Sequence, residues 1–92
     1  MISDPVCIRI DPEHIDSALQ EEAVEQVNRG QGEVVLDFSA VLRIDGNAVG
    51  ALEKLAGLAD GRSVRIVLRA VSVDIYRVLK ILGLTRRFGF IG

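Results

Sequence analysis

The sequence predicts an α/β fold in which a four-stranded, mostly parallel sheet is flanked by about three helices. Strand-like and helix-like segments alternate along the 92 residues, an order typical of parallel sheets with right-handed helical crossovers. Apolar residues make up 49% of the chain but aromatic residues only 4%, so an aliphatic core of helices packed on a sheet is expected. A chain of this length forms a single domain, residues 1–92.

The first strand is expected at residues 5–10, where the segment PVCIRI is rich in β-branched residues. Asp11-Pro12 ends this strand. Its one charged residue, Arg9, is tolerated at a sheet edge. Cys7 is interpreted as a small core side chain, and as the only cysteine it excludes an internal disulfide.

A first helix is expected over residues 16–28, because apolar residues recur there at helical intervals. The apolar stripe comprises Ile15, Ala18, Leu19, Ala23 and Val27. Two starts remain open: a capping box of Ser17 with Gln20, or an earlier start at Asp11-Pro12. Glutamates on the opposite face are interpreted as a solvated surface, with a partner contact as the lesser alternative.

The chain is organised around residues 34–52. Their first part, Val34 to Leu36, is a continuous apolar run of the kind found in strands buried on both faces. A turn then opens a second helix, whose buried stripe comprises Ala48, Leu52, Leu55 and Ala59. Asp45 is the expected N-cap, and Gly46 leaves the first turn without a side chain. The unpaired N–H groups of such a turn favour an anion or phosphoryl group and are open to a partner.

The last third of the chain predicts a strand, a helix and a short closing strand. The strand covers residues 63–69 (SVRIVLR). Ser72 is the expected N-cap of the third helix, and Gly83 supplies the left-handed residue that ends it. The predicted buried stripe of this helix comprises Ile75, Val78, Leu79 and Leu82. Residues 84–91 (LTRRFGFI) then return to the sheet.

Charge and composition exclude several classes of function. The net charge is −2 and the pI is about 5.3, so no overall positive field would gather nucleic acid or an anionic membrane. The sequence contains no recognisable leader and no long apolar span, so no direct membrane insertion is expected and the cytoplasm is the simplest location. His14 is the only histidine, so no metal site and no cofactor are expected.

Two linked stretches each carry a motif. The motif of the first comprises Asp37, Phe38, Ser39, Val41, Ile44, Asp45, Gly50 and Leu52. The motif of the second comprises Val78, Leu79, Gly83, Leu84 and Phe88. The first resembles the pattern "D-L-S-x-V, then I-D-S, then G-x-L" of the STAS domain, and the second resembles that family's closing pattern "V-L-x-x-x-G-L-x-x-x-F". Anti-sigma factor antagonists and sulphate transporters share this domain. The resemblance implies a STAS-like domain that works by docking, and not as an enzyme. Within the pattern, Asp37, Ser39, Gly83 and Leu84 are taken as structural residues.

In the sporulation-type and stress-type relatives, the serine after the "I-D" aspartate is phosphorylated by an anti-sigma factor with a histidine-kinase-like fold. Gly46 stands at that position here and Asn47 follows it, so the resemblance implies that the phosphorylation switch is lost. The implied docking residues are Arg43, Asp45, Gly46, Asn47, Val49, Gly50 and Lys54. The implied partner is a histidine-kinase-like anti-sigma factor or, as the alternative, a transporter ATPase or a chemotaxis-type complex. The protein itself is expected to be a monomer or weak homodimer.

Two enzyme-like alternatives have little support in the sequence. A receiver domain with Asp37 as phosphoacceptor needs clustered acidic residues for Mg²⁺ and a later lysine, but Asp11 stands alone and Arg69 and Ala70 occupy the lysine region. A hydrolase or metal enzyme needs a nucleophile with a base, or a ligand set, which one histidine and one cysteine do not supply. The hydroxyl of Ser39 is expected to hydrogen-bond the turn after the strand, and that of Ser72 to cap the third helix. Whether these hydroxyls or that of Thr85 are phosphorylated stays open at this point.

Overall fold

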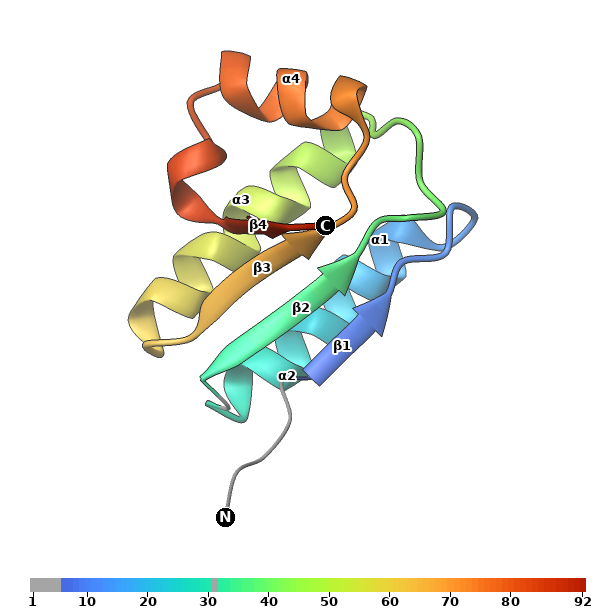
Figure 1. The fold of residues 1–92 in the computed structure, drawn as a ribbon. Helices are drawn as coiled ribbons and strands as arrows, with labels where there is room; N and C mark the ends of the chain where they lie inside the picture. Colours follow the sequence, from blue (N-terminus) through green and yellow to red (C-terminus); the bar gives the residue numbers. More distant parts are fainter. Residues whose placement is uncertain (1–5, 31) are drawn as a thin grey trace.

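The computed structural model describes residues 6–30 and 32–92 and has the alternating α/β order that the sequence predicts (Figure 1). The strands are β1 (Val6–Arg9), β2 (Glu33–Asp37), β3 (Arg65–Arg69) and β4 (Gly89–Ile91). The helical segments are α1 (Ile15–Ser17), η1 (Ala18–Glu22), α2 (Ala23–Asn28), α3 (Gly46–Gly61), α4 (Val73–Ile81) and η2 (Thr85–Arg87). The first residue of the predicted opening strand, Pro5, lies outside the described residues. The closing strand is shorter than predicted because the 3₁₀ turn η2 precedes it.

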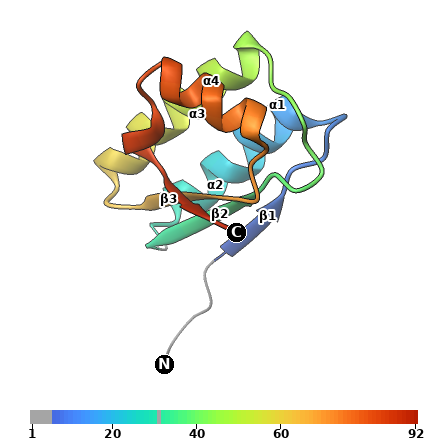
Figure 2. The ribbon, with the colours of Figure 1, turned by 45° about the horizontal axis from the view of Figure 1, so that its top comes forward.

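The four strands form one sheet in the order β1-β2-β3-β4, and every neighbouring pair is parallel. Connections between adjacent parallel strands that run in one direction across a sheet, all with the usual right hand, place every helix on the same side. Figures 1 and 2 show this arrangement, with the helices gathered on one side of the sheet. Within the described residues, no helix covers the other face.

The one-sided helix layer corrects the prediction for Cys7. Strand residues alternate between faces, so Ile8 is buried in the core while Cys7 next to it lies on the outer face and is exposed. In β2, Val34 is fully buried in the core, but Val35 lies on the outer face in register with Val67 of β3. Val35 is nevertheless buried, although no second helix layer covers it.

The first helix is continuous from Ile15 to Asn28, but its start and its middle differ from the prediction. Ser17 has helical backbone angles and makes no capping hydrogen bond, so the capping box is wrong. The helix begins at Ile15 without a side-chain cap. Asp11 instead orders the turn before it, where its carboxylate accepts a hydrogen bond from the backbone N–H of Glu13 at 2.9 Å.

The middle of this helix, η1, has π-helical hydrogen bonding. The buried positions Leu19, Ala23 and Val27 recur every four residues. In an α-helix of 3.6 residues per turn, each such step would rotate the buried stripe by about 40°. A locally wider turn compensates for this rotation, so the stripe continues to face the sheet and α3.

The second long helix, α3, carries the core as predicted, and its residues Ala48, Leu52, Leu55 and Ala59 are at most 2% exposed. The prediction for α4 is half right. Ile75 and Leu79 are buried, but Val78 is 37% exposed and Leu82 is 53% exposed. The helix lies along the margin of the layer (Figure 1), so only a narrow stripe of it meets the core.

Candidate functional site

The start of α3 is the centre of the candidate site. Asp45 has an extended backbone, and its Oδ1 accepts a hydrogen bond from the N–H of Ala48 at 2.9 Å, which confirms the predicted N-cap. Gly46 and Asn47 are both exposed in the first turn. Apart from the adjacent backbone, no atom lies within 4 Å of the position that a Cβ on Gly46 would occupy. The first turn therefore presents backbone and one amide side chain to solvent, with room for close approach.

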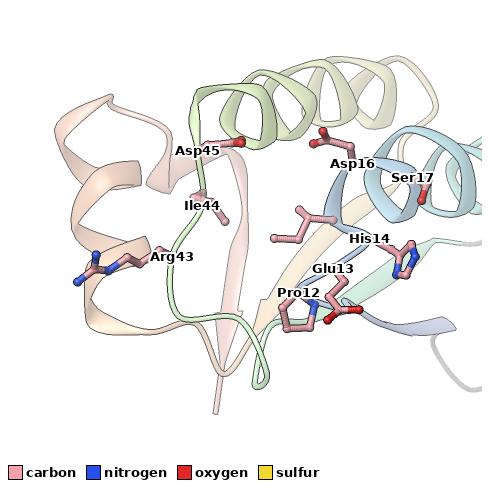
Figure 3. Close-up of a pocket in the computed structure, with 9 residues that line it drawn as sticks. Pro12, Glu13, His14, Asp16, Ser17, Arg43, Ile44 and Asp45 are labelled. Atoms are coloured by element: carbon pink, nitrogen blue, oxygen red, sulfur yellow. The ribbon is translucent and has the colours of Figure 1, made fainter.

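A groove of about 640 Å³ lies beside this turn, between the loop that leads into α1 and the segment Arg43 to Asp45. Figure 3 shows the carboxylates of Asp16 and Asp45 directed toward one another across the groove, while the guanidinium of Arg43 points away from it. Glu13 adds a third carboxylate to the lining. The N-terminus of α3 carries a partial positive charge and would by itself favour an anion. The three negatively charged carboxylates outweigh it, so the groove favours a cationic group.

The predicted docking residues are mostly, but not all, on the surface. Arg43 is well exposed and its Nε lies 4.0 Å from Oδ2 of Asp74, a distance at which an exposed pair contributes little stability. Gly50 is half-buried with open space at its Cβ position. Lys54 is exposed and borders a second, smaller groove of about 240 Å³ between η1, α2 and α3. Val49 is a correction: it is only 8% exposed and belongs to the core cluster, so it supports the surface from beneath.

Asp37 and Ser39 order the chain where it leaves β2. The backbone N–H of Ser39 donates to Oδ1 of Asp37 at 2.8 Å. This hydrogen bond, followed by one from the Ser39 hydroxyl and the charges of Arg69 and Arg9, lowers the pKa of Asp37 from its ordinary value of 3.8. Asp37 lies in register between Arg9 and Arg69. A receiver's magnesium site needs acidic neighbours at this place, so the structure speaks against the receiver alternative.

The closing motif is also structural. Gly83 has φ +72°, a conformation that favours glycine. The N–H of Leu84 donates to the carbonyl of Leu79 at 2.8 Å and the N–H of Gly83 to that of Lys80 at 3.1 Å, the two bonds of a Schellman cap. Leu84 is buried. The predicted left-handed end of α4 is therefore confirmed.

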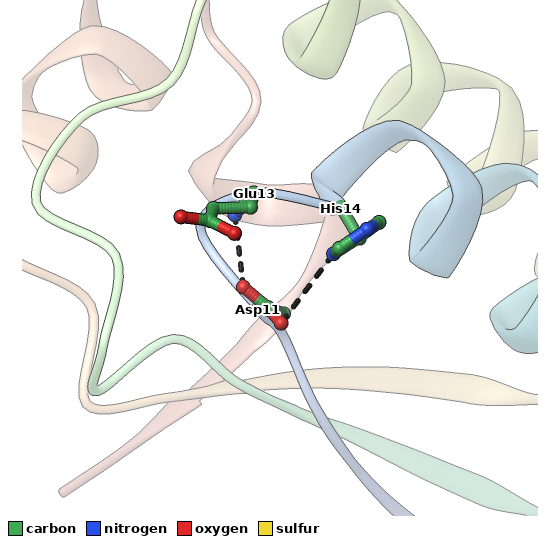
Figure 4. A group of neighbouring side chains, drawn as sticks. All are labelled: Asp11, Glu13 and His14. Carbon is green, nitrogen blue, oxygen red and sulfur yellow. Dashed lines mark hydrogen bonds and ion pairs between the residues drawn. The ribbon is translucent and has the colours of Figure 1, made fainter.

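The structure brings together one cluster that the sequence reading did not single out. Ligand atoms of Asp11, Glu13 and His14 lie within 4.8 Å of one another (Figure 4). His14 Nδ1 is 3.4 Å from Oδ2 of Asp11, and the hydrogen bond from the Glu13 backbone lowers the pKa of Asp11. All three residues are exposed, and these contacts are those of a turn. They supply no further sign of a bound ion.

A groove of about 350 Å³ between α4 and residues 43–44 was also missed. The helical spacing of Val78 from Ile75 and Leu82 predicts a buried position, whereas Val78 is exposed and lines this groove. One sequence signal could have revealed this groove: α4 has more apolar residues than a single buried face can accommodate, so some of them must be exposed. Ser72 ties the start of α4 to the loop between β2 and α3, since its hydroxyl donates to the carbonyl of Leu42 at 2.7 Å.

Comparison with solved structures supports the fold. The crystal structure of a candidate anti-sigma factor antagonist from Thermotoga maritima, TM1081, matches with a TM-score of 0.73 and 20% identity, covering 100% of this chain and 75% of the other. The NMR structure of TM1081 gives a TM-score of 0.74 and 20% identity, with 98% and 76% covered. No curated protein matches the sequence significantly.

Within the described residues, none of the helices has the length and apolar character needed to cross a membrane.

A family model for the STAS domain, with the description "Mlab, STAS domain", matches residues 9–91. The match includes the capped start of α3 and the closing segment at the end of α4. This chain belongs to the STAS domain family.

Proposed function

We propose that this STAS domain is a non-catalytic regulatory module that binds a protein partner through the start of α3. The observation that carries the proposal is the exposed first turn, in which the Asp45 cap fixes the backbone and Gly46 leaves it open. The contact surface comprises Arg43, Asp45, Gly46, Asn47, Gly50 and Lys54. The acidic groove beside it supports a partner that presents a cationic group.

The partner we favour is a histidine-kinase-like anti-sigma factor, as the resemblance implies. Position 46 has no hydroxyl, so the complex would not be released by phosphorylation at that position. Phosphorylation acts as a switch by adding close to two negative charges to a docking surface. Without that charge, the complex is governed by the concentration and state of the partner.

A second candidate partner is a transporter ATPase. The glycine at position 46 favours it, because a subunit that stays in its complex needs no release by phosphorylation. The two candidates share the same docking surface. They differ in one respect: an anti-sigma kinase would phosphorylate a hydroxyl introduced at position 46, whereas a transporter ATPase would not.

The first experiment compares the wild-type protein with Gly46→Glu in a pull-down from cells that express it naturally, with partners identified by mass spectrometry. The glutamate has room, since nothing lies within 4 Å of the Cβ position, so circular dichroism should show an intact fold. We expect wild type to capture a kinase-like anti-sigma factor or a transporter ATPase, and the variant to lose it. Equal capture by both forms would refute docking at the start of α3.

Gly57→Glu provides a matched control. Gly57 lies in the same helix with the same open surroundings, about 16 Å farther along the axis at 1.5 Å per residue. This variant should retain the partner. A Gly46→Ser variant then separates the two candidates, because an anti-sigma kinase supplied with ATP should phosphorylate it and let it go. A transporter ATPase should leave it unmodified and bound.

A further inference from the structure

The outer side of α4 exposes apolar side chains that nothing in the described structure covers. Ile81 is 76% exposed and Val73 is 72% exposed, and Leu42 on the loop beside the helix is 74% exposed. Between helix and loop lies the groove of about 350 Å³, with Ile44 and Val78 in its lining. We call these residues, with the exposed Arg43, Arg77 and Lys80, the α4 surface. Apolar side chains gathered beside a groove mark an interaction site more often than scattered ones do.

Positive and negative charges are unevenly distributed along the chain, with most acidic residues in residues 1–61 and most basic residues in residues 62–92. Residues 62–92 contain seven Arg or Lys residues and one acidic residue, whereas residues 1–61 contain four Arg or Lys residues and twelve acidic ones. The single acid of the second part, Asp74, already approaches Arg43. Arg77 and Lys80 form no ion pair within the described part of the chain. The α4 surface is thus apolar and cationic, although the whole protein is weakly acidic.

These features select one kind of occupant. Exposed aliphatic side chains give nucleic acid nothing to stack on, and a bilayer surface would not enter a groove that is enclosed by a loop on one side. A second copy of this chain would present its acidic first helix. However, the large apolar side chains exposed in the described structure lie elsewhere, at residues 42, 73–82 and 91. The remaining fit is a foreign protein segment that carries both acidic and apolar side chains.

We propose that the α4 surface binds an acidic segment of a protein partner, with an apolar side chain of that segment seated in the groove between α4 and Ile44. This inference rests on the proposed function, because it assumes that the same partner also docks at the start of α3. Arg43 borders both surfaces, so one partner can reach both. The acidic groove and the α4 surface would then receive groups of opposite charge from the same partner.

Site-specific photo-crosslinking tests this directly. A benzoylphenylalanine placed at position 81, at position 47 or at position 91 is activated in cells that express the protein naturally, and the crosslinked peptides are sequenced by mass spectrometry. Position 91 serves as the control, because Ile91 is also exposed, at 51%, but lies on β4 away from the groove. We expect position 81 to capture a foreign peptide with an excess of Asp and Glu and at least one large apolar residue.

The outcomes separate this inference from the proposed function. Capture at position 47 without capture at position 81 overturns the α4 surface and leaves the α3 site standing. Capture of an acidic segment at position 81 but nothing at position 47 supports the α4 surface and refutes docking at α3. Capture at position 81 of lipid, of a second copy of this chain or of a segment without acidic residues overturns the inference.

Binding of the captured partner gives the quantitative check. Ile81→Ser should weaken binding roughly ten- to hundredfold, since it removes the burial of one large aliphatic side chain. Ile91→Ser is the matched control and should bind like wild type. Arg77→Glu combined with Lys80→Glu should weaken binding by at least about tenfold at low salt, and by less as salt screens the charges. Unchanged binding in both variants would overturn the inference.

Discussion

Replacement of Asp45 by alanine tests the structural basis of the candidate site. The substitution removes the acceptor for the N–H of Ala48, a hydrogen bond of 2.9 Å at the first turn of the longest helix. Loss of an N-cap of this kind typically lowers the free energy of unfolding by about 1 kcal/mol. For a domain of 60–100 residues, that corresponds to a melting temperature lower by about 4–8 °C. Thermal unfolding followed by circular dichroism measures the shift.

Asp45→Asn separates the cap from the charge. The asparagine side chain retains an oxygen that accepts the same hydrogen bond, and asparagine is as good an N-cap as aspartate, so this variant should melt close to wild type. If Asp45→Asn were as destabilised as Asp45→Ala, the carboxylate charge and not the hydrogen bond would hold the turn. If Asp45→Ala melted like wild type, the cap would not fix the docking turn. Weaker partner binding by the stable Asp45→Asn would assign a direct contact to the carboxylate.

Three further substitutions test the fold around the site. Ser72→Ala should lower the free energy of unfolding by about 1–2 kcal/mol in urea, because it removes the α4 cap and the hydrogen bond to the carbonyl of Leu42. Leu52→Ala, at a fully buried position, should cost about 2–5 kcal/mol in the same assay. The lowered pKa of Asp37 stabilises the fold above the ordinary value of 3.8, and this contribution is lost as the pH falls through the folded-state pKa. Asp37→Asn should therefore lose less stability than wild type between about pH 5 and about pH 3.

The parts of the fold that follow from local sequence could be predicted. The Asp45 and Ser72 caps and the left-handed Gly83 each depend on one residue and its immediate backbone. The buried residues of α3 could also be predicted. This helix packs against both the sheet and neighbouring helices, so it buries a broad face and its apolar residues recur clearly at helical intervals. These local signals were enough to locate the exposed turn at Gly46.

The errors arose where the answer depends on the neighbours of an element. Cys7 has strand-like apolar neighbours in sequence, but its exposure depends on which face of the sheet the helices cover. Val78 and Leu82 have helical spacing, but their exposure depends on α4 lying at the margin of the layer. Val49 was assigned to the docking surface from its place in the motif, although the helix turns its side chain into the core. Periodicity reports which residues share a face and does not report what covers that face.

The arrangement of charge around the site constrains how a partner can bind. On one side of the segment from Arg43 to Asp45 lies a groove lined by the carboxylates of Glu13 and Asp16, and on the other side lies the cationic α4 surface with Arg77. A partner that uses both surfaces must place a cationic group on the first and an acidic group on the second. In the reversed orientation, like charges would face each other on both sides, which disfavours that complex. Under this proposal, the charge division would fix the orientation of the partner without any phosphoryl group at position 46. A glycine at that position would then remove the release step and leave recognition intact.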